Sequence, residues 1–483
     1  MSNLFRAPRR MVMVPLIVAC ALFMQNLDST IIATALPSIA ASLHEDPIRL
    51  NLAITSYLLS LAIFIPMSGW MADRLGARTV FRWAIVVFTL GSIACGFAGN
   101  LTVLVAARII QGAGGAMMVP VGRLVLLRTV PKSDLVWAMS YLTVPALLGP
   151  VIGPPLGGFI VTYSSWRWIF FINAPIGLLG VALVSLFIED VREPERPPLD
   201  VLGFALAGIG LATLMFGFEM LGRGPLPASL VALLLIAGAI LIALYVAHAR
   251  RVAFPIIDLA LLRIPTFMAA TVGGSLFRIG VGALPFILPL MLQLTFGLTA
   301  FASGLITFAS AAGAMTMKMT AAPIIRSLGF RRTLIGNAVI SSLFLFGYGL
   351  FRPSTPHALI FLTLLIGGFF RSLQFTSTNT LSFADVPPAM MSRATSFTSM
   401  AQQLSISLGV GVSALLLHVM LLLRGSKELL PSDFTLAFVV VGAVALVPVL
   451  LFLRLPPEAG AEMSGHRPAS VAAAGSASRA SSD

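Results

Sequence analysis

The sequence predicts an all-α protein that crosses a lipid bilayer many times. Hydrophobic residues make up 58% of the 483 positions and charged residues only 10%, with a mean hydropathy of +0.98. A soluble domain carries about 25% charged residues, so most of this chain is expected to lie in lipid. Apolar runs of about 18 to 25 residues recur along it, and each is long enough to cross a hydrocarbon core of ~30 Å.

Fourteen such runs are predicted as transmembrane helices, and short segments that contain polar residues, Gly or Pro separate them. In chain order they cover residues 12–36, 51–71, 80–98, 101–127, 136–160, 168–188, 201–221, 229–248, 266–294, 299–322, 333–351, 358–381, 395–421 and 434–453. The ninth and tenth runs are nearly continuous, because only residues 295–299 part them.

The segment after the sixth run is charged and Pro-rich, which indicates a linker, and the end of the chain is rich in Ala, Ser, Gly and Pro, which indicates disorder. The predicted divisions are a cytoplasmic N-terminus (1–11), a six-helix bundle (12–188), a cytoplasmic linker (189–200), two inserted helices (201–248), a cytoplasmic loop (249–265), a second six-helix bundle (266–453) and a disordered cytoplasmic tail (454–483).

The distribution of Lys and Arg predicts the orientation. Far more of these residues fall in segments that are cytoplasmic when both termini are inside than in the remaining loops. Arg9 and Arg10 precede an apolar run in which residues 17–20 resemble a lipoprotein cleavage box. Cleavage there would halve the first run, so we expect this segment to remain as a helix.

Composition argues against several other classes of function. The net charge of +13 does not indicate a nucleic-acid partner, because the basic residues are spread singly between apolar runs. Cys20 and Cys95 both lie inside apolar runs, so neither a disulfide nor a metal site is expected. The patterns H-E-x-x-H, G-x-S-x-G and G-x-x-x-x-G-K-[ST] are missing from the sequence, which argues against an enzyme and against ATP as the energy source.

A short charged turn joins the second and third runs. It contains Gly69, Asp73, Arg74, Gly76 and Arg78 within thirteen residues that end at position 81. Gly76 permits a tight turn with positive φ, and the Asp73 carboxylate can accept hydrogen bonds at a helix end or pair with arginine. The alternative is an ordinary positive loop without a special role.

The first and the fourth run each contain a charged residue at the start of a motif. Asp28 begins the string Asp-Ser-Thr-Ile-Ile-Ala-Thr-Ala-Leu-Pro, and Arg108 begins the string Arg-Ile-Ile-Gln-Gly. A charge in mid-membrane costs about 3 kcal/mol, so each is expected to face a cavity or a partner. Asp28 is therefore interpreted as a proton-carrying site or as a packing residue tied to Arg108, and the two roles are compatible.

The fifth run is rich in Gly and Pro. Pro removes backbone hydrogen bonds and kinks a helix, whereas Gly lets a neighbouring helix approach closely. The alternative is a generic kinked membrane helix. The positions concerned are Gly149, Pro150, Gly153, Pro154, Gly157 and Gly158.

The chain also shows a weak internal repeat. Leu75-Gly76-Ala-Arg78 matches Leu328-Gly329-Phe-Arg331, and the Arg108…Gln111 pair matches Arg371…Gln374. Both matches fall on corresponding runs when runs seven and eight are treated as an insertion between two six-helix halves. Asp73 has no acidic counterpart, because Arg326 occupies that position in the second half.

Four of these motifs resemble those of the major facilitator superfamily, and each lies on the corresponding part of the chain. The turn resembles G-x-x-A-D-R-x-G, the first run L-D-x-T-I-x-x-x-A-L-P, the fourth R-x-x-Q-G-x-G-A, and the fifth a lengthened G-P-x-x-G-G. The second and last of these are typical of the fourteen-helix drug:proton antiporters, in the multidrug exporter branch. The resemblance covers roughly residues 10–453.

This resemblance implies two six-helix bundles with two inserted central helices. It implies that the 69–78 turn is a conformational latch, that Asp28 and Arg108 couple transport to protons, and that the 149–158 motif accompanies export. The implied setting is the bacterial cytoplasmic membrane. The implied partners are protons, the lipid bilayer and a small-molecule substrate, with no cofactor other than the proton gradient, and a monomer is favoured although the sequence leaves the oligomeric state open.

The family plan places runs one, four, nine and twelve around a central cavity. Arg278, Arg371 and Lys318 lie on runs nine, twelve and ten, so the cavity is expected to be net positive. Arginine binds carboxylates in a bidentate manner, which makes an exporter of organic anions the alternative function. Further candidate substrate residues are Gln111, Gln374 and Asn379.

A structural role for these arginines is equally compatible with the sequence. In that case Arg278 would bond backbone carbonyls or Gln293, and Arg371 would bond Gln374 or Asn379. A non-transporting membrane sensor is the remaining alternative, and it would be expected to tolerate the loss of Asp28.

Overall fold

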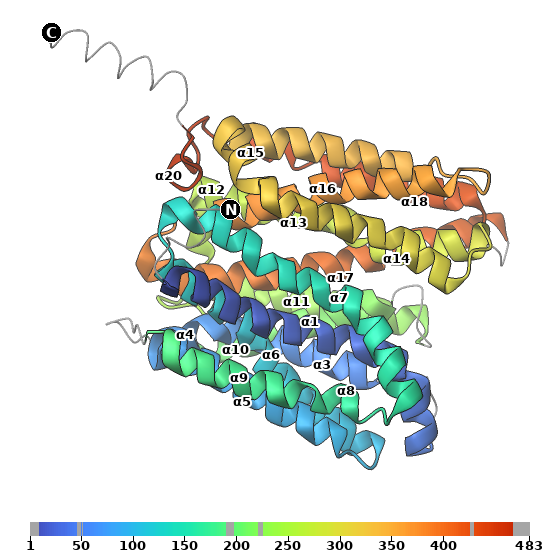
Figure 1. The fold of residues 1–483 in the computed structure, drawn as a ribbon. Helices are drawn as coiled ribbons and strands as arrows, with labels where there is room; N and C mark the ends of the chain where they lie inside the picture. The colour runs from blue at the N-terminus through green and yellow to red at the C-terminus, as the bar shows by residue number, and fades with distance from the viewer. Residues whose placement is uncertain are drawn as a thin grey trace, which may run out of the picture. The chain divides into compact units, whose positions relative to one another are not determined.

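The computed structural model describes residues 9–45, 50, 52–189, 198–220, 226–425 and 429–466, and all regular secondary structure in these residues is helical (Figure 1). The predicted all-α class is therefore confirmed. The chain forms two compact units. Unit 1 contains Met1–Val130, Tyr141–Leu259 and Pro387–Val412, and unit 2 contains Pro131–Ser140, Ala260–Val386 and Ser413–Asp483.

Unit 1 is built from the helices of the first half of the chain, together with the beginning of one later helix. They are α1 (Arg9–Leu43), α3 (Leu52–Phe64), α4 (Ser68–Leu75), α5 (Ala77–Gly96), α6 (Leu101–Thr129), most of α7 (Leu135–Tyr163), α8 (Trp168–Phe171), α9 (Asn173–Phe187), α10 (Val201–Met220), α11 (Ala228–Ala249) and the first part of α17 (Met391–Arg424). Within it, α5 packs against both α6 and α9.

Unit 2 contains the remaining helices. They are α12 (Pro265–Met268), the π-helix η4 (Ala269–Gly273), α13 (Gly274–Gly282), α14 (Leu284–Leu290), the π-helix η5 (Met291–Thr295), α15 (Ala300–Tyr348), α16 (His357–Leu381), the end of α17, α18 (Pro431–Leu446), α19 (Val449–Phe452) and α20 (Ala461–Ser464). The ninth predicted run is thus one helical path interrupted by two π-turns, which are frequent at functional positions in helices.

Eleven of the described helical segments are long and apolar enough to cross a membrane. They coincide with eleven of the fourteen predicted runs. The other three runs fall on α7 and on α15, which is 49 residues long and has a non-helical residue, Gly329, inside it. The helices thus cover every predicted run, while the count of fourteen membrane crossings stays a prediction.

Two glycines at the repeated sequence have the same unusual backbone conformation. Gly76 has φ 89° and ψ 136°, and Gly329 has φ 73° and ψ 166°. Residues with a side chain rarely adopt positive φ, whereas Gly does so readily. Each glycine ends one helix and starts the next, which is the correspondence that the internal repeat predicts.

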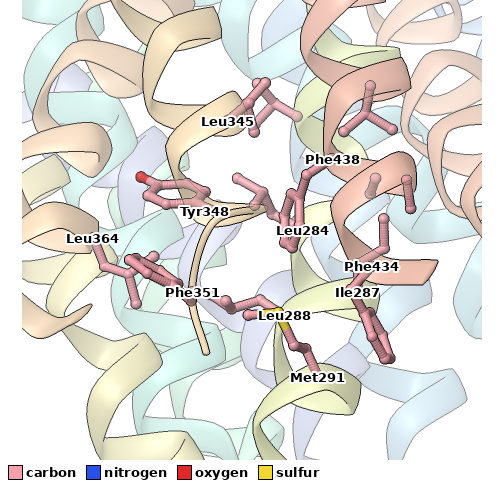
Figure 2. Packing of buried hydrophobic residues seen from close by; sticks show 14 of the residues in the cluster. Leu284, Ile287, Leu288, Met291, Leu345, Tyr348, Phe351, Leu364, Phe434 and Phe438 are labelled. Carbon is pink, nitrogen blue, oxygen red and sulfur yellow. The ribbon is translucent and has the colours of Figure 1, made fainter. Parts of the chain in front are cut away.

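Apolar packing holds each unit together. In unit 2, aliphatic residues of α14 meet aromatic residues of α18 and the end of α15, among them Tyr348, Phe434 and Phe438 (Figure 2). The Tyr348 and Phe438 rings make an edge-to-face contact with centroids 6.1 Å apart. In unit 1, Ile31, Ile32 and Ala35 of α1 belong to a cluster that also contains Trp166 and residues of α6.

The inserted helices α10 and α11 pack within unit 1. Leu211, Ala212 and Met215 of α10 form an apolar cluster with Ala62 of α3, and α11 also packs against α10. A Cβ atom at Gly238 of α11 would lie 2.7 Å from Leu214, so the two helices approach closely there. This placement gives the two helices absent from the twelve-helix plan a specific neighbour, α3.

The beginning of the segment predicted as a disordered tail is folded. Leu455, Ala459 and Met463 are buried, and residues 461–464 form α20. The expectation of disorder was wrong for residues 454–466 because these few apolar side chains find partners in unit 2, including Phe330 beside Gly460. Residues 467–483 lie outside the described part of the chain.

Candidate functional site

Asp28 lies at the centre of a buried polar cluster in unit 1. Its Oδ2 accepts a hydrogen bond from Arg108 Nη1 at 2.6 Å, and its Oδ1 accepts from Gln111 Nε2 at 2.8 Å and from Asn173 Nδ2 at 3.1 Å. The side chains of Asp28 and Arg108 are both 0% exposed. The pairing that the sequence suggested for these two residues is therefore present.

Arg108 is held in place by neutral groups as well as by Asp28. Its Nε donates to the backbone oxygen of Ala53 at 3.1 Å, and its Nη1 also donates to Gln111 Oε1 at 2.7 Å. The guanidinium carbon lies 4.2 Å from the centroid of the Tyr57 ring. Removing one partner of a buried ion pair leaves an uncompensated charge and costs about 3–5 kcal/mol, so Asp28 and Arg108 depend on each other.

Asn173 is a member of the cluster that was not predicted from the sequence. It is the first residue of α9, and its Nδ2 donates both to Asp28 and, at 3.0 Å, to Ser92 Oγ of α5. Ser92 Oγ in turn donates to the backbone oxygen of Phe170 at 2.9 Å. The available signal was a lone amide inside the apolar sixth run, because such a residue needs a buried partner.

The Gly-rich motif of α7 packs against α1 next to Asp28. A Cβ atom at Gly149 would lie 2.8 Å from Leu27 N, and one at Gly153 would lie 2.3 Å from Thr30 Oγ1. Gly158 has no such neighbour within 4 Å, so only part of the motif serves close packing. Gly157 is buried, and the side chains of Pro150 and Pro154 lie outside what the structure describes.

The predicted latch residue Asp73 contacts α17 and α6 within unit 1. Its Oδ2 accepts a hydrogen bond from Ser392 Oγ, and its Oδ1 lies 3.4 Å from Arg128 Nη2. A Cβ atom at Gly69 would lie 2.8 Å from the Ser392 backbone oxygen, so this glycine allows α4 to lie against α17. Ser68 and Ser396 are hydrogen-bonded at 2.8 Å across the same contact.

The two basic residues of the predicted latch have other partners than Asp73. Arg74 lies over the Trp70 ring with its guanidinium carbon 5.6 Å from the centroid, and Arg78 donates to the backbone oxygen of Ser185 near the end of α9. An arginine at a helix C-terminus satisfies carbonyl groups that have no helical partner. Arg128, which the sequence indicates only as a loop charge, takes the place beside Asp73.

The loop after α11 makes a second contact with α17. Arg393, next to Ser392, pairs with Asp258 at 3.1 Å. Asp200 accepts from Gly203 N at 2.8 Å and lies 2.7 Å from His248 Nε2, so it ties the start of α10 to the end of α11. Asp200 and Arg393, together with Asp73, border a small hollow that has room for about one water molecule.

The cationic side chains expected around the substrate cavity lie in unit 2, where Arg278 and Lys318 are buried and Arg371 is half-buried. Arg278 Nη2 donates to Asn379 Oδ1 at 2.6 Å, and its guanidinium carbon lies 5.2 Å from the Phe375 centroid. Arg371 Nη2 donates to Ser310 Oγ at 2.7 Å. Lys318 Nζ donates to Thr376 Oγ1 at 2.6 Å.

These contacts differ from those expected if Arg278 and Arg371 have a structural role. Asn379 binds Arg278 and not Arg371, whose partner Ser310 was not predicted. Gln111 binds inside the Asp28 cluster. Its repeat counterpart Gln374 is fully buried, with neither Oε1 nor Nε2 hydrogen-bonded among the described residues.

The sequence matches the model of the Major Facilitator Superfamily along residues 18–410 and again along residues 270–479. The chain belongs to the major facilitator superfamily. This confirms the resemblance inferred from the four motifs, and with it the transporter class of the protein.

Relatives of this major facilitator protein support the multidrug branch. It is 37% identical to MdtD of Yersinia enterocolitica over 459 residues, covering 95% of this chain and 98% of the relative. It is 39% identical over 457 residues to MdtD of Salmonella heidelberg, covering 91% and 94%. The name of both relatives describes a multidrug resistance protein.

Two solved transporter structures share the fold. The human organic anion transporter MFSD10 (TETRAN) superposes with a TM-score of 0.65 at 16% identity, covering 92% of this chain and 100% of that one. The proton:xylose symporter XylE superposes with a TM-score of 0.66 at 14% identity, covering 94% and 98%. At these identities the likeness concerns the fold alone.

Proposed function

We propose that this protein is a proton-coupled antiporter that exports small amphiphilic molecules, drugs among them, across the bacterial cytoplasmic membrane by alternating access. In this proposal both termini are cytoplasmic and the proton gradient is the only energy source. One observation carries the proposal: a carboxylate in mid-membrane, Asp28, is held by Arg108, Gln111 and Asn173 in a fully buried cluster.

The cluster has the properties that a proton-exchange site needs. When Asp28 is ionised, its charge is balanced by Arg108, which stays protonated at any physiological pH. A proton on Asp28 removes that balance and favours a rearrangement of α1 against α6. Because α7 packs on α1 at Leu27 and Thr30, beside Asp28, such a movement reaches a third helix directly.

The decisive experiment is the measurement of substrate-induced proton release from purified protein with ethidium, chloramphenicol and deoxycholate as cationic, neutral and anionic probes. Wild-type protein is expected to release protons with at least one probe, and Asp28→Asn with none. Asp134→Asn, in the short helix η2 (Lys132–Asp134) outside the predicted runs, is the matched control. Proton release that survives in Asp28→Asn would contradict the proposal.

A second candidate is the export of organic anions bound by Arg278 and Arg371. It is favoured by the neutral character of the groups that hold the cations of α15 and α16, since Ser310 accepts from Arg371 and Thr376 from Lys318. A neutral partner balances no charge, so an anionic ligand would be attracted to this region.

Variants of the two arginines test the second candidate. Arg278→Gln and Arg371→Gln are expected to lose deoxycholate export, because each removes a positive charge from the proposed anion site. Arg352→Gln, whose wild-type side chain bonds backbone oxygens beyond α15, is expected to retain it.

Two results decide between the candidates. Unchanged deoxycholate export in both variants, or a response to ethidium alone, excludes anion binding by these arginines. A protein that moves none of the three probes would contradict both candidates.

A further inference from the structure

Arg123 is a buried arginine that lies outside the four motifs. It lies in α6, six residues before the end at Thr129, and inside the fourth predicted transmembrane run. It is 6% exposed, and no carboxylate of the described residues lies within 4 Å of its guanidinium nitrogens. A lipid-spanning segment rarely contains a guanidinium without a role, because burying its charge is costly.

The contacts of Arg123 are long and neutral. Its Nη1 lies 3.4 Å from Thr398 Oγ1 and its Nη2 lies 3.4 Å from Gln402 Oε1, both on α17 within unit 1. Typical N–H···O bonds are about 2.7–3.2 Å long, so these are weak. Its Nε, which is also buried, has no hydrogen-bond partner among the described residues.

The same stripe of α17 holds another buried polar group without a partner. Ser399 is 6% exposed, and its Oγ is not hydrogen-bonded among the described residues. Gln402 follows Thr398 by four residues and Ser399 by three, so it is a neighbour of both along the surface of α17. One charged donor, Arg123, therefore lies beside neutral polar groups of α17.

We propose that Arg123, with Thr398, Ser399 and Gln402, forms a binding site for the carboxylate group of an organic anion. A carboxylate bridges the Nε and Nη2 edge of a guanidinium with two parallel bonds, and this is the edge on which Arg123 has one atom without a partner and one weak contact. A single arginine among neutral groups matches one negative charge and not the two of a phosphate.

Binding replaces weak contacts with charge-assisted ones. The carboxylate takes the place of Thr398 Oγ1 and Gln402 Oε1, the two weak acceptors of Arg123, and the amide Nε2 of Gln402 is a further donor that can reach it. The inference rests on the proposed export function, because it names the chemical class of one substrate. It differs from the second candidate above, because that one uses residues of unit 2.

The test is equilibrium binding of benzoate to the full-length protein in lipid nanodiscs, measured by calorimetry without a proton gradient. Wild type is expected to bind benzoate and not benzamide, which has the same shape without the charge. Arg123→Gln is expected to weaken benzoate binding about tenfold or more, as the loss of charged hydrogen bonds implies. Arg352→Gln, in unit 2, is the control and is expected to leave the affinity unchanged, and Arg278→Gln reports on the second candidate.

Three outcomes overturn the site: unchanged benzoate affinity in Arg123→Gln, loss of affinity only in Arg278→Gln, or chloride binding as tight as benzoate and lost in the same variant. If Arg123→Gln does not fold, Arg123→Lys carries the test. It keeps the charge but not the planar fork, so benzoate binding is expected to weaken several-fold, and an unchanged affinity overturns the site. Because the assay involves no transport, its failure is distinguishable from failure of the antiport proposal.

Discussion

Asn173 connects the ion pair of Asp28 and Arg108 to a neighbouring helix. Its amide donates to Asp28 and to Ser92, so the position of the carboxylate on α1 depends on α9 and α5. Gln111 makes a comparable contact from α6. A carboxylate with three donors is oriented in one direction, and a proton that binds it must disturb these hydrogen bonds.

Asn173→Ala is expected to lower proton-coupled export several-fold and to destabilise the protein by about 1–3 kcal/mol, because it removes a donor from a buried charge. Thermal unfolding and drug export in proteoliposomes measure the two effects. Asn337→Ala, a buried asparagine of α15 whose Nδ2 has no hydrogen-bond partner among the described residues, is the control for stability. Equal export by Asn173→Ala and wild type would show that α9 does not position Asp28.

The contact between α1 and α7 depends on two glycines spaced by one helical turn. Neither Gly149 nor Gly153 has room for a methyl group, since backbone or side-chain atoms of α1 lie within 3 Å of the place that a Cβ atom would take. The motif therefore acts as a packing surface next to the proposed proton site. This gives the Gly-rich fifth run a more specific role than a kinked helix has.

Gly149→Ala is expected to lower the stability of the protein by about 1–3 kcal/mol through overpacking and to reduce export. Gly158→Ala, in the same motif and with nothing within 4 Å, is expected to have little effect on either. Thermal unfolding of the two purified variants gives the comparison. Equal losses in both variants would mean that the motif acts through backbone flexibility and not through packing.

The turns at Gly76 and Gly329 end two corresponding helices with positive φ. Gly76→Ala is expected to cost about 1 kcal/mol or more, because alanine is strained in this conformation. Gly336→Ala, a helical glycine of α15 with nothing within 4 Å, is expected to be neutral or slightly stabilising. If Gly76→Ala and wild type have the same unfolding curve, the turn geometry is contradicted.

For the molecule as a transporter, the important question is which contacts hold one state of the cycle. In unit 1, adjacent residues of α17 are held by two carboxylates, Ser392 by Asp73 and Arg393 by Asp258. The second carboxylate comes from the loop after the inserted helices. The loop that follows the two inserted helices therefore adds a contact beside the proposed latch.

Ser392→Ala is expected to shift the equilibrium between the conformations of the transport cycle by about tenfold or more, because it removes a hydrogen bond to a charged group. Asp258→Asn is expected to shift it in the same direction by a smaller factor. The shift is measured by thiol labelling of a single cysteine placed at Thr79, beside the turn, in a background without Cys20 and Cys95. Labelling rates that match those of the parent protein would exclude a latch at this contact.

Much of the architecture follows from the sequence. Periodic long apolar runs predict helices that cross a membrane, because a helix satisfies its own backbone hydrogen bonds in lipid. The ion pair of Asp28 and Arg108 was one of the two interpretations that the sequence left open, and the repeated Leu-Gly-x-Arg predicted that the segments around Gly76 and Gly329 correspond. In each case a short stretch of sequence is sufficient, because a buried charge needs a partner and a positive φ favours glycine.

Partners that come from distant parts of the chain were decided only by the tertiary structure. Asn173 beside Asp28, Ser392 and Arg128 beside Asp73, and the neutral partners of Arg123 are separated in sequence from the residues they contact. A single polar residue in an apolar run indicates that it needs a partner, but many helices could supply one. The sequence by itself thus determined the membrane fold and the charged centre, whereas packing chose the neighbours that orient each charge, because hydrogen-bond partners depend on which helix faces meet.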